Sequence, residues 1–220
     1  MRRKPNADQR RRDLCDAAIE LLAEDGARGL THLRVDRRAG VADGTTSFYY
    51  QTRSALLRGA TDRVVQLDVA DFTAAMNEAK TATDNKTESL LSRLAEQAMR
   101  TGVEPERSRA RARFELLMVA ARDPELGAVF GDLMDRFVAI SEEAVAQLQP
   151  ADRPPDRELI EKQAFAVVTF LGGFLFRLAN GLAGLDSAEQ LEGYLHGVIA
   201  GVAAEHARIP GKGGRRATRA

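Results

Sequence analysis

The sequence predicts an all-α protein with about nine helices. Apolar residues recur at helical spacing in one segment after another, and strand-like alternation is absent from the sequence. Prolines fall close to the expected helix starts, at Pro105, Pro124 and Pro154-Pro155, where the missing backbone N–H costs nothing. The positions of the prolines and the helical periodicity therefore both predict an all-α fold.

The first three predicted helices are closely spaced, and the second and third of them are short. A helix over about 11–26 has one apolar face, made by Leu14, Ala17, Ala18, Leu21 and Leu22. Gly26 stops it in the position that favours a left-handed cap. Thr31 can cap a second helix that reaches Ala39, and Gly40 ends it after about two turns. A third short helix follows over about 43–49.

The rest of the chain forms longer helices. Thr52 or Ser54 can cap the first of them, which carries apolar residues from Leu56 to Phe72. Further helices are expected over about 87–101, 105–122, 124–148, 156–184 and 187–207. We predict a domain over 1–53, a second over 54–207, and a basic, disordered tail over 208–220.

Composition excludes several classes of protein. The chain has no net charge and one cysteine, Cys15, so it has no internal disulfide framework. The arginine-rich start lacks the apolar run of a secretory signal. The apolar run over 165–176 is shorter than the roughly 18 residues that span a bilayer, so we interpret it as a buried core helix. We expect a cytoplasmic protein without membrane contact.

Charge is segregated along the chain. Residues 1–58 carry a net charge of +4, residues 208–220 carry +5, and the remainder carries −9. A basic head indicates an anionic partner at that end. A solvated surface explains the same excess, so charge alone leaves both interpretations open.

A tight turn at Ala39-Gly40 joins the two short helices and predicts a helix-turn-helix. Ala39 allows close approach, Gly40 can adopt positive φ, and Val41 is expected to join a small core that includes Leu21, Leu33 and Val35. The third helix carries hydroxyl groups suited to phosphate oxygens. Phe48 and the methyl group of Thr46 suit the thymine methyls of a major groove. The sequence thus predicts binding to double-stranded DNA.

The stretch "GLTHLRVDRRAGVADGTTSFYYQTRSALL", with the helix before it, resembles the tetracycline-repressor-like (TetR) family of transcriptional regulators. The resemblance covers about residues 10–60 and includes Thr31, Ala39-Gly40-Val41, Gly44, the Tyr49-Tyr50 pair, Arg53 and Leu56. It implies a helix-turn-helix DNA-binding domain followed by a helical ligand-binding and dimerisation domain. The expected DNA-binding residues are Thr31, Arg37, Arg38, Gly44, Thr45, Thr46, Ser47, Phe48, Tyr49 and Arg53.

Three positions depart from the family pattern: Asp36 replaces alanine, Ala42 replaces serine and Ser47 replaces tyrosine. We expect Asp36 to face away from the duplex or to orient Arg37 or Arg38, because an unpaired carboxylate would repel phosphates.

Roles within the site divide into positioning and base reading. Tyr49 and Arg53 are expected to contact phosphates, whereas Thr46 and Phe48 are expected to read bases. For five residues, contact with DNA has an open alternative. Tyr50 and Phe48 can instead belong to the core, and Arg37, Arg38 and His32, each a possible phosphate contact, can instead be solvated surface residues.

The resemblance also implies a small-molecule pocket in the larger domain. Candidate lining residues are Phe72, Met76, Met99, Phe114, Met118, Phe137, Phe174, Arg177 and Asn180, with Phe130, Met134 and Phe165 as further candidates. An ordinary apolar core is the alternative for each of them.

The last helix spaces Gly193, Gly197 and Gly201 four residues apart, which makes a stripe without side chains. A four-helix bundle between two subunits would use this stripe together with Gly172 and Val198, and the resemblance implies the same homodimer. Tight packing within one chain is the alternative. His196, in the same helix, is interpreted as a packing residue.

These features predict a ligand-responsive regulator, a dimeric repressor that an unknown small molecule releases from a near-palindromic operator. An enzyme is not expected, because the sequence lacks metal-ligand spacing, a phosphate-binding glycine loop and an activated cysteine, and we expect no cofactor or metal. A helical protein-interaction module or an all-α enzyme, in either case without DNA binding, stays the alternative.

Overall fold

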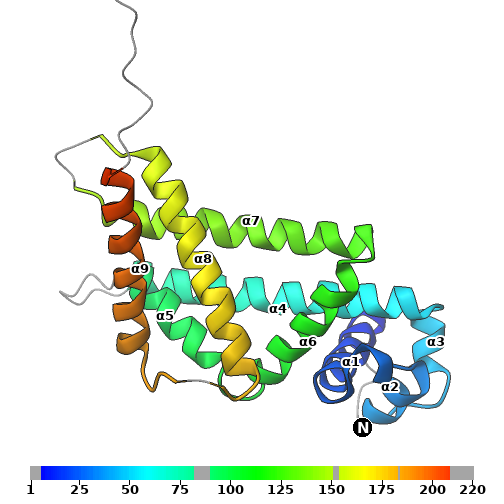
Figure 1. Ribbon diagram of the computed structural model, residues 1–220. Helices are drawn as coiled ribbons and strands as arrows, with labels where there is room; N and C mark the ends of the chain where they lie inside the picture. Colours follow the sequence, from blue (N-terminus) through cyan, green and yellow to red (C-terminus); the bar gives the residue numbers. More distant parts are fainter. Residues whose placement is uncertain (1–5, 82–89, 151–153, 183, 209–220) are drawn as a thin grey trace, which may run out of the picture.

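The computed structural model describes residues 6–81, 90–150, 154–182 and 184–208, with the backbone alone for residues 75–81. This part of the chain contains nine α-helices and no strand (Figure 1). The helices are α1 (Ala7–Gly29), α2 (His32–Arg38), α3 (Thr45–Tyr49), α4 (Arg53–Thr81), α5 (Leu90–Arg100), α6 (Glu106–Ala120), α7 (Pro124–Ala146), α8 (Arg157–Ala179) and α9 (Ala188–Arg208). The predicted all-α fold is confirmed. Apart from Arg208, the predicted tail lies outside the described residues.

Side-chain caps fix several helix starts. Asn6 accepts a hydrogen bond from the backbone N–H of Gln9 at 2.7 Å, so α1 begins earlier than its apolar periodicity predicts. Thr31 caps α2, and Thr52, rather than Ser54, caps α4 by accepting from Ala55 N–H at 3.1 Å. Gly26 has the expected positive φ of 67°, but the chain continues beyond this kink to Gly29.

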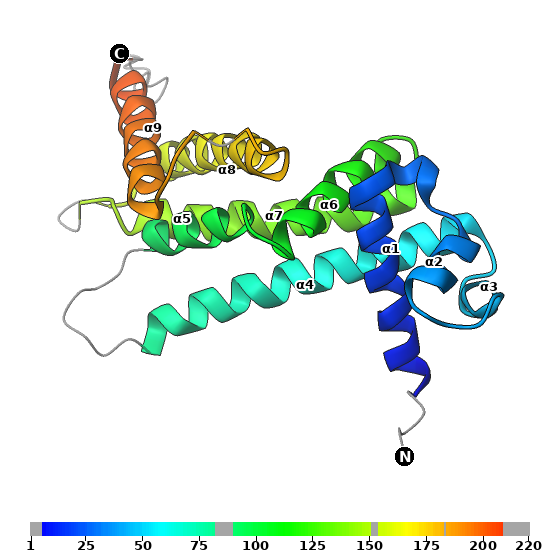
Figure 2. The same ribbon diagram turned by 90° about the horizontal axis from the view of Figure 1, so that it is seen from below.

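The first three helices form a head at one end of an elongated molecule, and α9 lies at the other end (Figure 1). Helix α4 runs from the head along the body, and α1 crosses it (Figure 2). Helix α8 ends at Ala179 with Asn180 as its C-cap, before the predicted boundary at residue 184, and Gly181 then turns the chain with a φ of 71°.

The buried apolar residues form two clusters. The first joins α1, α2 and α4 of the head side to Leu116 of α6 and Leu126 of α7. The second fills the body between α5, α7, α8 and α9, around Leu91 and Leu195. The head therefore shares one buried core with α6 and α7. The predicted domain boundary at residue 53 stays a prediction.

Helix α8 is not the buried core helix that its apolar run predicts. Its length and composition would allow it to cross a membrane, but the core helices of soluble proteins meet the same two criteria. In this structure only 22 % of its apolar window is buried. Much of the helix therefore presents apolar side chains outward.

Candidate functional site

The α2–turn–α3 unit has the geometry of a helix-turn-helix. Gly40 takes a φ of 63° in the turn, as predicted, and Val41 N–H donates to the carbonyl of Asp36 at 3.0 Å. Gly44 occupies the N-cap of α3 with a φ of 91°, a conformation that favours glycine. The two glycines direct α3 outward from the end of α2.

The carboxylate of Asp36 holds the beginning of α3. One oxygen accepts from Gly44 N–H at 2.7 Å, and the other accepts from the N–H of Thr46 at 2.7 Å and from its hydroxyl at 2.6 Å. Asp36 is only 1 % exposed. A negative charge at a helix N-terminus is stabilised by the free N–H groups and the helix dipole. Asp36 therefore fixes α3 on α2.

This contact corrects the prediction for Thr46 and decides between the two alternatives for Asp36. Thr46 is fully buried with its hydroxyl bonded to Asp36, so it cannot reach a base edge. Asp36 does face away from the exposed side of the head, but it orients α3 rather than Arg37 or Arg38. The sequence does contain a hint of this contact. An acidic residue that replaces alanine on α2 needs hydrogen-bond donors if it is buried, and Gly44 and Thr46 follow it by eight and ten residues.

The exposed face of α3 offers an apolar ring beside a hydroxyl. Phe48 is 79 % exposed, and Ser47 next to it is also exposed. Phe48 contacts Tyr49 edge to face, with ring centroids 5.2 Å apart. The guanidinium of Arg11 lies 5.4 Å from the centroid of the Tyr49 ring. Arg11 thus brings a positive charge beside α3, which the basic start of the sequence indicated without singling out this residue.

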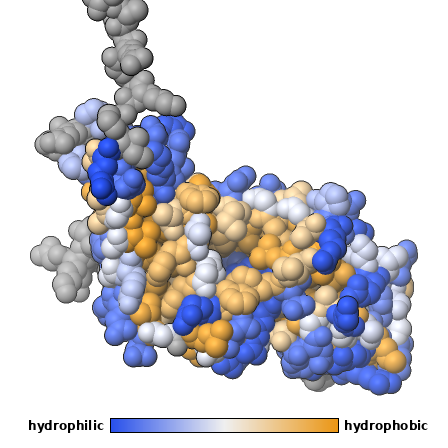
Figure 3. Space-filling model, viewed as in Figure 1, coloured by the Kyte–Doolittle hydropathy of each residue, from blue (hydrophilic) through white to orange (hydrophobic). Residues whose placement is uncertain are grey.

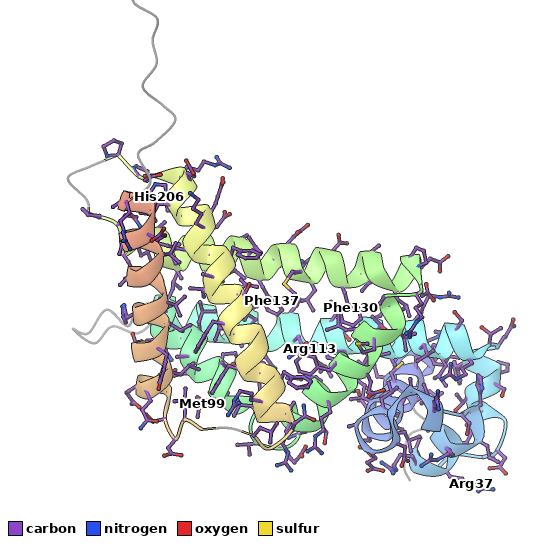
Figure 4. The ribbon with its side chains drawn as sticks, in the orientation of Figure 1. Arg37, Met99, Arg113, Phe130, Phe137 and His206 are labelled. Carbon is purple, nitrogen blue, oxygen red and sulfur yellow. The ribbon has the colours of Figure 1, made fainter. Side chains whose placement is uncertain are left out.

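The two neighbouring arginines of α2 differ in environment. Arg37 is exposed at the outer edge of the head (Figure 4), with no ion pair among the described residues. Arg38 instead donates to Glu24 at 2.9 Å and to Glu20 at 3.0 Å. Its hydrogen bond lowers the pKa of Glu24. Arg38, predicted as a phosphate contact, is therefore neutralised within the chain.

Three other predicted contacts are engaged in the fold. The guanidinium of Arg53 donates to the carbonyl of Ala27, and the hydroxyl of Thr45 donates to the carbonyl of Ala42 at 2.6 Å. Thr31 caps α2 and remains exposed. All three still lie at the head surface or its edge, but local hydrogen bonds account for their side chains.

Tyr50 belongs to the support of the site rather than its surface. Its hydroxyl lies 3.0 Å from the sulfur of Cys15, and a Cβ at Gly59 would approach its ring to 2.6 Å. His32 contacts the carbonyl of Tyr50 through Nε2 at 2.7 Å. Burial raises the pKa of the Cys15 thiol. Leu33, expected in the small core, is instead 43 % exposed on α2.

The body contains a cavity of about 170 Å³ between α4, α5, α6, α7 and α8. Phe72, Phe114, Phe130, Met134 and Phe137 line it, as the sequence predicts. Figure 4 places Phe130, Phe137 and Arg113 in the body, far from Arg37 in the head. Aromatic walls around a few polar groups are typical of small-molecule sites.

An ion network forms one wall of the cavity. Asp68 contacts Arg109 at 3.0 Å and Arg113 at 2.7 Å, and Arg109 also pairs with Asp71. Asp68 is 8 % exposed. Because both guanidinium groups have carboxylate partners, the network is balanced within the protein.

Several predicted pocket residues lie elsewhere. Met118, Phe165 and Arg177 are exposed, and Asn180 caps α8. Phe174 belongs to the second apolar cluster, and Met99 packs against it. The side chain of Met76 lies outside the described residues. Periodicity identified apolar positions but could not separate a filled core from a cavity wall.

The glycine stripe is open. A Cβ added at Gly193, Gly197 or Gly201 would meet nothing within 4 Å, and the same holds for Gly172, which also borders the cavity. Tight packing within one chain therefore does not explain these glycines. Apolar patches cover the surrounding face (Figure 3), which includes exposed Phe165 and Tyr194 and half-buried Val198. His196 is exposed on this face rather than packed.

Helix α6 connects the cavity to the head. Arg113, Phe114 and Leu117 line the cavity, whereas Glu115 accepts a hydrogen bond from Ala27 N–H at 3.1 Å, just after the kink in α1. The carbonyl of the same Ala27 accepts from Arg53 at the start of α4. One residue of α1 is therefore held from both the body and the base of the head.

The comparisons with known proteins agree on one family. The family model described as "Tetracyclin repressor-like, C-terminal domain" matches residues 83–201. No curated protein matches the sequence.

Solved structures share the fold at low sequence identity. A Pseudomonas aeruginosa PAO1 protein identified as a transcriptional regulator has a TM-score of 0.71 and 17 % identity, covering 94 % of this chain and 97 % of its own. A Saccharomonospora viridis regulator in complex with choline has a TM-score of 0.69 and 19 % identity, over 88 % and 96 %. A TetR-family regulator from Rhodococcus sp. has a TM-score of 0.65 and 21 % identity, over 88 % and 98 %.

Proposed function

The chain belongs to the TetR family of transcriptional regulators, with a ligand-binding C-terminal domain, and on this premise we propose that it is a cytoplasmic, dimeric repressor that a small molecule releases from a near-palindromic operator. The family consists of regulators rather than enzymes.

The observation that carries DNA binding is the fixed and outward-facing α3. Asp36 holds its N-terminus with three hydrogen bonds, and Phe48 and Ser47 project to solvent. An exposed phenylalanine on a helix-turn-helix suits thymine methyls in a major groove. Arg37 adds a positive charge for phosphates, and Arg11, which pairs with Asp8 at 3.5 Å, lies over the ring of Tyr49.

Dimerisation is supported by the open face of α8 and α9. Bare glycines next to exposed Phe165 and Tyr194 form an apolar surface with a narrow stripe for a facing helix. A bundle of α8 and α9 from two subunits would bury this surface and account for the apolar α8 without a membrane. It would also present two copies of α3 to successive major grooves, about 34 Å apart.

Release by a small molecule is supported by the cavity and by α6. A ligand among Arg113, Phe114 and Leu117 acts on the helix whose Glu115 holds Ala27. A ligand that binds better to one position of α6 favours one setting of the heads, which is all that the coupling requires. The choline complex of the Saccharomonospora viridis regulator supports a small molecule as effector.

Selection of bound fragments from genomic DNA tests the proposal. The selected operator is then compared with a scrambled duplex in binding isotherms at several salt concentrations. Specific, salt-sensitive binding by a dimer, at a near-palindromic site, is expected. Equal affinity for both duplexes would refute operator recognition and favour the alternative, a helical protein-interaction module.

A further inference from the structure

The charged groups around the cavity do not balance once the ion network is complete. Asp68 and Asp71 neutralise Arg109 and Arg113. Glu106, in the first turn of α6, also lines the cavity, and its carboxylate has no hydrogen bond or ion pair among the described residues. The lining itself has two carboxylates and two guanidinium groups, and Asp71, which pairs with Arg109 from outside the lining, brings the net charge of the group to −1.

The uncharged part of the wall favours the same kind of ligand. Four phenylalanines surround the space, and two of them, Phe72 and Phe137, meet edge to face with centroids 5.7 Å apart. The faces of aromatic rings attract cations, more strongly where water is excluded. An apolar wall with a free carboxylate therefore provides both area and a counter-ion for a positively charged molecule.

One buried hydroxyl adds an acceptor. Ser141 lines the cavity and is 2 % exposed, and within the described part of the chain its hydroxyl forms no hydrogen bond. Because this hydroxyl borders the cavity, it can accept a hydrogen bond from a donor bound there. Gln97 and Thr101 also contribute polar groups to the lining.

We propose that the cavity binds an organic cation, a protonated amine on an apolar or aromatic body, with Glu106 as its counter-ion and Ser141 as a hydrogen-bond acceptor. This inference rests on the proposed function because it takes the cavity as the effector site. An organic anion is disfavoured, since it would have to displace Asp68 from two guanidinium groups that already hold it.

Benzylammonium, benzyl alcohol and benzoate test the charge preference, since they share one ring and differ in charge. Binding to the full-length protein is measured by calorimetry and ligand-observed NMR. Benzylammonium should bind about tenfold more tightly than benzyl alcohol, and benzoate most weakly. Glu106→Gln should lower the affinity for benzylammonium about tenfold and leave that for benzyl alcohol unchanged. Asp132→Asn, which removes an exposed carboxylate from α7 outside the cavity lining, is the matched control.

The proposal is overturned if benzoate binds as tightly as benzylammonium, if benzylammonium fails to bind at millimolar concentration, or if Glu106→Gln leaves its affinity unchanged. Operator isotherms without any of these molecules test the proposed function separately. A protein that binds its operator specifically but prefers benzoate would refute only the charge of the effector.

The acceptor role of Ser141 has its own comparison. Ser141→Ala should weaken benzylammonium, which has N–H donors, and leave benzyltrimethylammonium, which has none, unchanged. An equal loss for both cations, or no loss for benzylammonium, would show that Ser141 does not accept a hydrogen bond from the ligand.

Discussion

The polar groups that hold α3 in the head and those that line the cavity of the body differ in how completely they are hydrogen-bonded. In the head, Asp36 and Thr46 satisfy each other and the backbone of α3, and Tyr50 pairs with Cys15. In the body, Ser141 faces a cavity without a hydrogen bond among the described residues, and Glu106 lines the same space. A Cβ added at any of the three glycines of α9 would meet no atom within 4 Å.

The difference fits the roles proposed for the two regions. A surface that reads DNA gains from side chains held in one geometry, because ordering them on binding costs free energy. A body that responds to a ligand and a second subunit needs unfilled space and unpaired groups until they arrive. We therefore interpret the hydrogen-bonded polar groups around α3 as structural, and the unbonded polar groups of the cavity as candidates for ligand binding.

The largest effect on stability is expected from removing the hydrogen bonds between Asp36 and α3 in the head. Asp36→Ala removes the acceptor of the Gly44 N–H and of the N–H and hydroxyl of Thr46. Thr46 is fully buried, so its two donors would lose their partner without gaining water. The free energy of unfolding should fall by about 3 kcal/mol, measured by urea denaturation. Operator affinity should fall as well, because α3 is no longer fixed on α2.

Asp43→Ala is the matched control, since it removes an exposed carboxylate from the same turn. It should change the free energy of unfolding by less than about 0.5 kcal/mol. Asp36→Asn, which keeps one acceptor oxygen, should fall between the two. Equal stabilities for Asp36→Ala and the parent protein would show that the carboxylate does not hold α3.

Next in size is the effect of filling the open glycine stripe of the body. Gly197→Leu should weaken dimerisation by about 2 kcal/mol, or roughly thirtyfold, because a leucine would separate the facing helices. Gly131→Leu is the control, since Gly131 on α7 is equally open but lies outside α8 and α9. Sedimentation equilibrium measures both. A monomeric parent protein at micromolar concentration would refute the interface.

The sequence predicts the frame of the head better than its chemistry. Thr31, Gly40 and Thr52 perform the local roles assigned to them, because caps and tight turns depend on a few neighbouring residues. Thr46 was assigned to the wrong side of α3. A helix of five residues has too few turns for periodicity to show which face is buried, and its partner Asp36 lies on another helix.

In the body, residue type was predictable but position was not. Phe72, Phe114 and Phe137 reach the cavity, whereas Met118 and Phe174 do not. All five are apolar residues on amphipathic helices, and only the packing of α4 to α8 decides which of them borders empty space. The ion network of Asp68 with Arg109 and Arg113 joins α4 to α6, so local sequence does not reveal it.

A smaller effect, confined to one kind of DNA, is expected from the exposed face of α3. Phe48→Ala should cost about 1 to 2 kcal/mol of binding free energy on the operator and much less on a scrambled duplex, because its ring is expected to contact bases. Binding isotherms on both duplexes measure the difference. If both affinities fall equally, Phe48 does not read sequence.

The smallest effect should distinguish Arg37 from Arg38, which are adjacent in the chain and identical in charge. Arg37→Ala should weaken binding to operator and scrambled DNA alike and reduce the slope of log K against log salt by about one, as the loss of one phosphate contact requires. Arg38 already contacts Glu24 and Glu20, so its charge is compensated before DNA arrives. Exposed ion pairs of this kind contribute little to stability, and Arg38→Ala should leave both folding and the salt slope nearly unchanged. The two slopes are measured on the same duplexes between low and moderate salt. If Arg38→Ala reduces the slope as much as Arg37→Ala, Arg38 exchanges its glutamates for phosphate on binding, and the head is less rigid toward DNA than its hydrogen bonds indicate.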